Sequence, residues 1–329
     1  MRGLTLVTGA TGFIGSYVVR RLVAAGAPVR VLVRRPEALP EAIRGRVDIR
    51  QGDVGDPVAL PDAVEGVRTV LHLAACARAW SRDPREFAAV NVEAVERLLQ
   101  AAWDCQVERL VHVSTILTLP PFRPAPGQSG VARLTPYEQT KRAGERLVES
   151  YAAQGRQAVI VHPTRVYGPG PLTDANAVTR VVGLYLSGRF RVRLADGDVL
   201  GSYVHADDVA AGIVLAAQRG RRGAHYVLGG ENASLRRLLE LASEVVGVRR
   251  RVVVLPPVLV LAAAHAAALW GRLGGRAPIT PGWVRVFLED RRADIALARR
   301  ELGYAPRPLR QGLAETIAWL QGVAAREAA

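Results

Sequence analysis

The chain has 329 residues, of which 49% are hydrophobic and 22% charged, and this ordinary globular composition excludes a disordered or collagen-like chain. The formal net charge of +14 invites a nucleic-acid-binding role, but its arginines are scattered along the chain without a binding motif, so we expect no specific nucleic-acid partner. Two cysteines, Cys76 and Cys105, stand outside any metal-ligand spacing, which excludes a disulfide scaffold and favours a cytoplasmic protein without a metal.

The first half of the chain alternates apolar runs with helical patterns. Such alternation predicts an α/β fold with a doubly wound parallel sheet of the Rossmann type. The predicted strands cover residues 3–8, 29–33, 47–51, 68–73, 108–114 and 157–162, and the predicted helices cover 13–25, 57–65, 84–104 and 136–153.

The second half is less regular and predicts a smaller, mainly helical lobe. A Gly/Pro cluster at 168–171 separates a dinucleotide-binding domain, 1–167, from a substrate-binding lobe, 168–329. We expect residues 201–228 to return to the first domain. The predicted helices are 176–187, 207–219, 234–246, 257–272 and 309–321, with short strands near 190–194 and 224–228.

Membrane and export signals are weak. The strand-like run at 4–7 begins almost at the first residue, which leaves no room for a cleaved signal peptide. The uncharged stretch 252–271 contains Pro256 and Pro257, so its helical part is only about 14 residues long, short for a bilayer span. A buried or interfacial helix is the better interpretation, and peripheral membrane contact stays open.

The first predicted strand leads into a glycine-rich turn, Gly9-Ala10-Thr11-Gly12-Phe13-Ile14-Gly15, that opens a helix. Glycines at these spacings allow a tight turn and let backbone N–H groups approach a pyrophosphate at the helix N-terminus. An isolated turn of this kind could be merely structural. Its position in a strand–turn–helix unit favours dinucleotide binding.

The end of the second predicted strand indicates which dinucleotide is bound. An acidic residue there would hold a ribose hydroxyl of NAD, whereas this chain has Arg34 and Arg35, which suit the 2′-phosphate of NADP(H). Solvated surface arginines are the alternative, so NAD(H) stays open. After the third strand, Asp53 is expected to accept a hydrogen bond from the adenine amino group.

Tyr137 and Lys141 are four residues apart on a predicted helix and therefore share a face. A nearby ammonium and an oxidised nicotinamide both favour the phenolate, so we expect a lowered pKa for Tyr137 and acid–base catalysis at neutral pH. A hydroxyl from Ser114-Thr115 would hold the same substrate oxygen. Lys141 is the one lysine among 44 basic residues, which suggests a position where arginine cannot substitute.

At these residues the chain resembles the extended short-chain dehydrogenases/reductases, the NAD-dependent epimerase/dehydratase family, over nearly its whole length. The resemblance rests on the glycine turn, His72-Leu73-Ala74-Ala75, Asn91-Val92, Tyr137/Lys141, the segments 163–169 and 203–209, and Leu302-Gly303-Tyr304. It implies that Thr115, Tyr137 and Lys141 are catalytic. It also implies a cofactor site formed by Gly9, Thr11, Gly12, Phe13, Ile14, Gly15, Arg34, Asp53, Val54, Leu73, Ala74, Ala75, Asn91, Ser114, Tyr137, Lys141, Pro163 and Val166.

Two departures from the family narrow the reaction. Dehydratases carry an Asp-Glu pair where this chain has Ile116-Leu117, and sugar-nucleotide epimerases usually carry an Arg-Asp pair where it has Gly201-Ser202. The remaining resemblance is to the dihydroflavonol-4-reductase, 3β-hydroxysteroid dehydrogenase and hopanoid-associated epimerase group. It implies reversible hydride transfer between NADPH and a ketone or secondary alcohol on a fairly apolar small molecule.

Two alternatives stay open. A sugar or sugar-nucleotide epimerase with tightly bound cofactor would use the same residues, and Arg189, Arg191 or Arg193 could replace the missing cation. An NADP(H)-sensing binding protein is the non-enzymatic alternative, against which the retained Tyr137 and Lys141 argue. The resemblance also implies a homodimer formed through helices 84–104 and 136–153.

Overall fold

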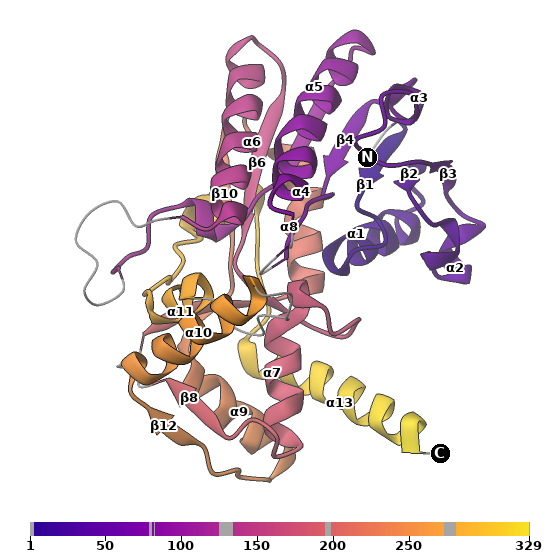
Figure 1. The fold of residues 1–329 in the computed structure, drawn as a ribbon. Helices are drawn as coiled ribbons and strands as arrows, with labels where there is room; N and C mark the ends of the chain where they lie inside the picture. Colours follow the sequence, from indigo (N-terminus) through magenta and orange to yellow (C-terminus); the bar gives the residue numbers. More distant parts are fainter. Residues whose placement is uncertain are drawn as a thin grey trace.

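The computed structural model describes residues 3–78, 81, 83–124, 134–194, 199–272 and 281–328. Seven parallel strands form its central sheet in the order β10-β6-β5-β4-β1-β2-β3 (Figure 1). Their bounds are β1 Thr5–Thr8, β2 Val29–Val33, β3 Asp48–Gln51, β4 Thr69–His72, β5 Arg109–Val113, β6 Ala158–Pro163 and β10 His225–Leu228. The predicted doubly wound parallel sheet is therefore confirmed, with a seventh strand from the second half of the chain.

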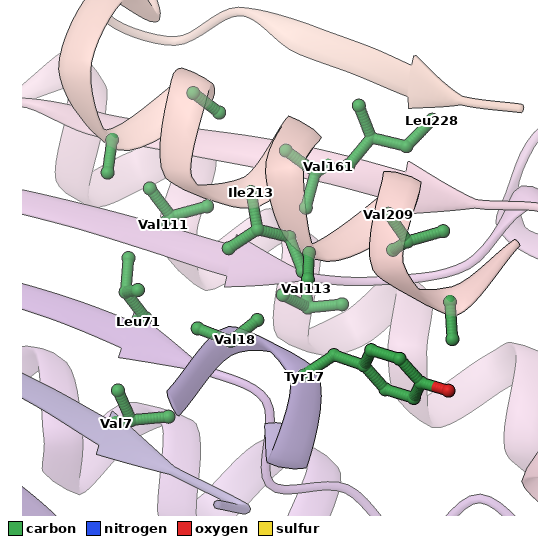
Figure 2. Close-up of a cluster of buried hydrophobic side chains, with 14 of the residues drawn as sticks. Val7, Tyr17, Val18, Leu71, Val111, Val113, Val161, Val209, Ile213 and Leu228 are labelled. Atoms are coloured by element: carbon green, nitrogen blue, oxygen red, sulfur yellow. The ribbon is translucent and has the colours of Figure 1, made fainter. Parts of the chain in front are cut away.

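Helices cover both faces of this sheet because its strands are apolar on both sides. On one face, Val18 and Ile213 pack towards strand residues such as Val111 (Figure 2). On the other, Leu98 and Val148 belong to a second buried cluster. The helices concerned are α1 Phe13–Ala24, α2 Glu41–Arg44, α3 Ala59–Val64, α4 Arg85–Ala88, α5 Ala94–Asp104, α6 Pro136–Ala153 and α8 Ala206–Arg219, with a π-helical turn at Ala89–Glu93 between α4 and α5.

The C-terminal lobe has a core of its own, which includes Tyr167, Val182, Leu241 and Leu313. It contains α7 Ala177–Leu186, α9 Leu235–Val246, α10 Pro257–Arg272, α11 Pro281–Leu288 and α13 Leu309–Ala328. Helix α12 Ala296–Leu302 instead packs in the core of the central sheet, through Ala298 and Leu302. The strands of the lobe form two small sheets, β11-β9-β7 (Glu231–Ser234, Leu200–His205, Arg165–Tyr167) and β12-β8 (Val253–Leu255, Val192–Leu194). Sequence reasoning missed β7, β9, β11 and β12, because β7 and β12 have only three residues each, and β9 and β11 carry polar residues or glycine.

The strand order reverses its direction at β1, since β2 lies on one side of it and β4 on the other. Ligands of doubly wound sheets bind beyond the carboxyl ends of the strands at such a reversal. The glycine-rich turn follows β1 and residues Leu73–Ala75 follow β4. The fold therefore brings these two predicted cofactor segments to one crevice.

Candidate active site

The glycine-rich turn is shaped by close contacts with its neighbours. Gly9 has φ 72°, and a Cβ there would lie 2.7 Å from the backbone nitrogen of Ala74. A Cβ on Gly15 would collide with the carbonyl oxygen of Gly9. Gly12 is the N-cap of α1 and provides no side-chain cap, which leaves the first turn of the helix accessible to an anion. These residues, with exposed Thr11, half-buried Ile14 and buried Phe13, fit a dinucleotide pyrophosphate.

The β1 and β4 ends are joined by a hydrogen-bonded pair. The Oγ1 of Thr8 lies 2.8 Å from Nδ1 of His72, and the same oxygen accepts the backbone N–H of Ala74 at 3.3 Å. This contact holds the small residues Leu73–Ala75 beside the glycine turn.

The predicted adenosine end of the site lies at the ends of β2 and β3. Arg34 directly follows β2 and is exposed, with its Nε 3.7 Å from Oδ2 of Asp53. The other carboxylate oxygen of Asp53 accepts the backbone N–H of Gly55 at 2.8 Å, and Val54 is buried between them. Arg34 and Asp53 are thus adjacent, as one site for a ribose phosphate and an adenine requires.

Tyr137 lies in the first turn of α6. Its phenol faces the side chain of Thr115, the residue that follows Ser114 beyond β5. Burial raises the pKa of Tyr137 to about 12, while the side chain of Thr115 acts in the opposite direction. The expected lowering of this pKa is therefore wrong for this structure, because burial outweighs the effect of Thr115 and the nearby carboxylates Glu138 and Glu145 raise the pKa further.

Lys141 is the most deeply buried member of the predicted catalytic set, with an exposed fraction of 2%. Its Nζ donates to the carbonyl oxygen of Val113 at 2.8 Å and lies 3.4 Å from Nε2 of His112. Burial lowers the pKa of Lys141 to about 8, against the opposing effect of Glu145. The ammonium is thus directed towards β5, while Tyr137 is directed towards Thr115.

The histidines beside Lys141 are buried. His72 and His112 stack with ring centroids 5.4 Å apart, and burial lowers the pKa of His72 to about 3 and that of His112 well below its usual value. A neutral His112 can accept a hydrogen bond from the Lys141 ammonium. These rings therefore form the floor of the site.

Glu145 is a residue that sequence reasoning missed. Its buried carboxylate accepts hydrogen bonds from Ser114 Oγ and from Thr118 Oγ1, the latter at 2.7 Å, and lies 3.5 Å from Nδ1 of His162. Ser114, predicted to contact the cofactor, is thus engaged by Glu145. The signal was available, since Tyr137, Lys141 and Glu145 follow one another at intervals of four on α6.

The side chain of Asn91 positions α6, the helix that carries Tyr137 and Lys141. The Nδ2 of Asn91 donates to Thr140 Oγ1 at 3.1 Å, and its Oδ1 accepts the backbone N–H of Cys76 at 2.9 Å. This side chain therefore links α6 to the segment after β4.

A buried ion cluster joins Arg285, Glu289 and Arg291, which follow α10, to Glu138 of α6. Nη2 of Arg285 donates to both carboxylate oxygens of Glu138, at 2.7 and 2.5 Å. Arg291 pairs with Glu289 at 2.6 Å and donates to the carbonyl oxygens of Ile116 and Leu119. The lobe thus holds the start of α6 and the segment after Thr115. No sequence signal indicated this contact, because its partners are about 150 residues apart.

The remaining predicted residues lie near β6 and β7. Pro163 is the last residue of β6 and Val166 lies in β7, and both are buried.

Within the described residues, no group of His, Cys, Asp or Glu side chains could hold a metal ion, and both cysteines are free.

Comparison with known proteins shows which family has this fold and this set of residues. Residues 5–229 match the model of the NAD-dependent epimerase/dehydratase family. The chain belongs to this family. Its catalytic fold is therefore that of an extended short-chain dehydrogenase/reductase, and the chain is an enzyme of the oxidoreductase, epimerase and dehydratase group.

Three similar proteins indicate the range of reactions within the family. The chain is 31% identical to "Sterol demethylase protein B" of Methylococcus capsulatus, over 96% of this chain and 98% of that protein. It is 33% identical to "4-hydroxy-2-methyl-3-oxo-4-farnesyl-3,4-dihydroquinoline-1-oxide ketoreductase" of Stigmatella aurantiaca, over 93% of each chain. A solved structure, "MoeE5 in complex with UDP-glucuronic acid and NAD", superposes with a TM-score of 0.74 and is 30% identical, over 98% of this chain and 100% of that one.

Proposed function

We propose that this family member reduces a ketone on a fairly apolar substrate with NADPH, and catalyses the reverse oxidation of the secondary alcohol. The observation that carries the proposal is the position of Tyr137 and Lys141 at the carboxyl end of β5, where the Tyr137 phenol faces Thr115 and the Lys141 ammonium donates to the carbonyl oxygen of Val113. Because burial raises the pKa of Tyr137 to about 12, the phenol keeps its proton at neutral pH and can give it to the alkoxide that forms as hydride arrives.

Each side chain has a defined part in this chemistry. When bound, the nicotinamide dinucleotide supplies or accepts the hydride. Tyr137 donates a proton to the carbonyl oxygen, and Thr115 orients the phenol and polarises that oxygen. Lys141 supplies a positive charge below about pH 8 and its ammonium would bind the cofactor's ribose.

One feature argues against a dehydration, and another supports an apolar substrate. Ile116 and Leu117, which follow Thr115, contribute no acid–base group, so a dehydration has no second catalyst at this position. Two similar proteins are named for a sterol and for a farnesylated ketone, which are both largely apolar. The solved MoeE5 complex contains a sugar nucleotide, and we treat that substrate class as the alternative below.

We propose a preference for NADP(H) because of the position of Arg34. Its guanidinium follows β2 and is exposed beside Asp53, so it can pair with a 2′-phosphate. We expect Arg34→Asp to weaken NADPH binding roughly 10- to 100-fold, the value of a lost charge-assisted hydrogen bond. NADH binding should change little, because NADH lacks the phosphate.

Fluorescence titration of the two dinucleotides measures this difference, with Arg35→Asp as a matched control of equal charge change one residue away. Ketone screening with steroid ketones and long-chain ketones then tests the reaction itself. Equal loss of NADPH and NADH affinity in Arg34→Asp, or equal affinity of the unmodified enzyme for both, would contradict the 2′-phosphate contact.

A sugar-nucleotide epimerase is the alternative, and Arg165 is the observation that favours it. A Cβ on Gly201 would collide with the guanidinium of Arg165. Arg165 therefore brings a positive charge to the position where sugar-nucleotide epimerases usually carry their own arginine. Arg165 also donates to the hydroxyl of Tyr203 at 3.1 Å. A dinucleotide that copurifies without exchanging, and turnover without net NADPH consumption, would support the epimerase.

We also propose that the enzyme is a homodimer through α5 and α6. A hollow of about 290 Å³ lies between these helices, lined by Leu99, Trp103, Leu147 and Tyr151 together with polar residues. Trp103 is partly exposed there, an aromatic anchor of the kind that dominates interfaces. We expect a dimer in light scattering at micromolar concentration and a monomer for Trp103→Glu, whereas a monomeric unmodified enzyme would refute the proposal.

A further inference from the structure

Helix α10 is apolar on two sides, which is unusual for a helix at the surface. One side packs on α11, through Val260, Leu261 and Ala264 against Val284 and Leu288. The opposite side is exposed, although a surface helix ordinarily presents polar residues there. The helix therefore carries an apolar stripe for which the described part of the chain supplies no cover.

The stripe runs the full length of α10. Two pairs of apolar residues on α10 are eleven residues apart, Val258 with Leu269 and Leu259 with Trp270. Eleven residues make close to three helical turns, so the two members of each pair lie on the same side of the helix. Their exposed fractions are 73%, 58%, 57% and 64% respectively. Strand β12, which leads into α10, adds exposed Val253 and Val254. We call these six side chains the α10 stripe; Figure 1 shows α10 in the C-terminal lobe with β12 in the same lobe.

The charge around the stripe has one sign. Residues 245–272 contain four arginines and neither aspartate nor glutamate. Arg249 and Arg251 are exposed immediately before β12, and Arg250 between them donates to the carbonyl oxygen of Leu186 at 3.2 Å. An apolar surface bordered by arginines is complementary to an anionic lipid bilayer, where apolar side chains enter the acyl boundary and guanidinium groups pair with phosphates.

We propose that the α10 stripe docks the enzyme on an anionic membrane surface. No helix of the described residues is long and apolar enough to cross a bilayer, and α10 with 16 residues extends about 24 Å, so it would lie in the plane of the interface. A second copy of this chain is a poorer partner for the stripe, because it would bring two sets of these arginines together.

The docked stripe lies close to the catalytic residues through α11. Helix α11 packs on α10, and its Arg285 holds Glu138, the neighbour of Tyr137. The same helix contacts the start of α6 at Gly282, where a Cβ would lie 2.7 Å from Cγ2 of Thr135. The membrane surface would therefore meet the lobe that covers the site. The docking itself requires no turnover, so it stands or falls independently of the proposed reduction.

Vesicle co-sedimentation tests the docking. We expect the enzyme to bind vesicles of phosphatidylglycerol mixed with phosphatidylcholine, to bind pure phosphatidylcholine more weakly, and to lose affinity at high salt. Val258→Glu/Leu259→Glu should lower binding about tenfold or more, because two apolar contacts are replaced by charges repelled by the lipid. Both positions lie in the first helical turn, where glutamate favours the helix, so the fold should persist.

Two further variants separate the contribution of the arginines from that of the apolar side chains and from a general effect of added negative charge. Arg249→Gln/Arg251→Gln should reduce binding to the anionic vesicles alone. Val58→Glu changes an equally exposed valine, with an exposed fraction of 77%, outside this lobe and should leave binding unchanged. Absence of vesicle binding by the unmodified enzyme would overturn the proposal, as would equal loss in Val58→Glu. So would a Val258→Glu/Leu259→Glu variant that changes only the oligomeric size.

Discussion

Tyr137→Phe is expected to lower kcat for ketone reduction about 10²- to 10⁴-fold, the usual contribution of a positioned proton donor. The phenol is the group that faces Thr115, and the substitution removes its proton without changing the ring. Affinity for NADPH should change little, because the ring still fills the same space. Steady-state kinetics with the best ketone from the screen and NADPH titration measure the two effects separately.

Tyr151→Phe provides a matched control on the same helix. Tyr151 is buried in α6, and its hydroxyl has no hydrogen-bond partner among the described residues. Removing that hydroxyl should leave kcat and the melting temperature unchanged. Comparable losses in both variants would mean that the effect arises from the packing of α6, and retained activity in Tyr137→Phe would exclude Tyr137 as the proton donor.

Lys141→Arg is expected to lower kcat/KM about 10²-fold or more, although both residues are cationic. The Lys141 ammonium lies in a buried space between Val113 and His112 that accommodates a compact group. A planar guanidinium is larger and stays charged at every accessible pH. NADPH affinity should fall together with turnover, since this ammonium would bind the ribose.

Arg142→Lys is the matched control for this variant, because it makes the reverse exchange at the exposed neighbouring position. We expect it to leave the kinetics and the melting temperature unaltered. Full activity in Lys141→Arg would refute a specific role for the amine, and would leave chance as the explanation for the single lysine.

The single lysine also allows a direct measurement of its charge. NMR of protein labelled with ¹³C at the lysine ε-carbon should give one titrating resonance with a midpoint near pH 8, because burial lowers the pKa of Lys141 to about 8. The unfolded chain, with a usual lysine pKa of about 10.4, binds more protons between these two values, so this group makes stability rise with pH across that window. In Glu145→Gln the midpoint should fall further, since Glu145 raises this pKa.

The order of strands and helices in the first half could be predicted because its signals are local. The runs Val29–Val33 and Thr69–His72 are buried on both faces, and their apolar pattern directly predicts parallel strands. The glycine turn is equally local, since Gly9 and Gly15 are required by contacts within the turn and with the next loop. Tyr137 and Lys141 could be paired because helical periodicity places residues four apart on one face.

The chemical environment of these residues depended on contacts between distant segments. Burial sets the pKa of Tyr137, and its pKa rises where the local charges alone suggested a fall. Glu145, although regularly spaced with Tyr137 and Lys141, acquires its function only because β5 brings Ser114 to its carboxylate. Charge and hydrogen bonding in a buried site depend on how much water is excluded, which a linear pattern does not encode.

The sequence alone determined the fold class, the cofactor crevice and the catalytic pair, because each follows from local periodicity or a short turn. The tertiary structure decided how the C-terminal lobe holds the site, since Arg285 reaches Glu138 across 147 residues and Arg291 reaches Ile116 across 175 residues. It also decided that α10 exposes one apolar side. The hydropathy of residues 257–272 is the same whether that side is covered or exposed, and only the packing against α11 distinguishes the two.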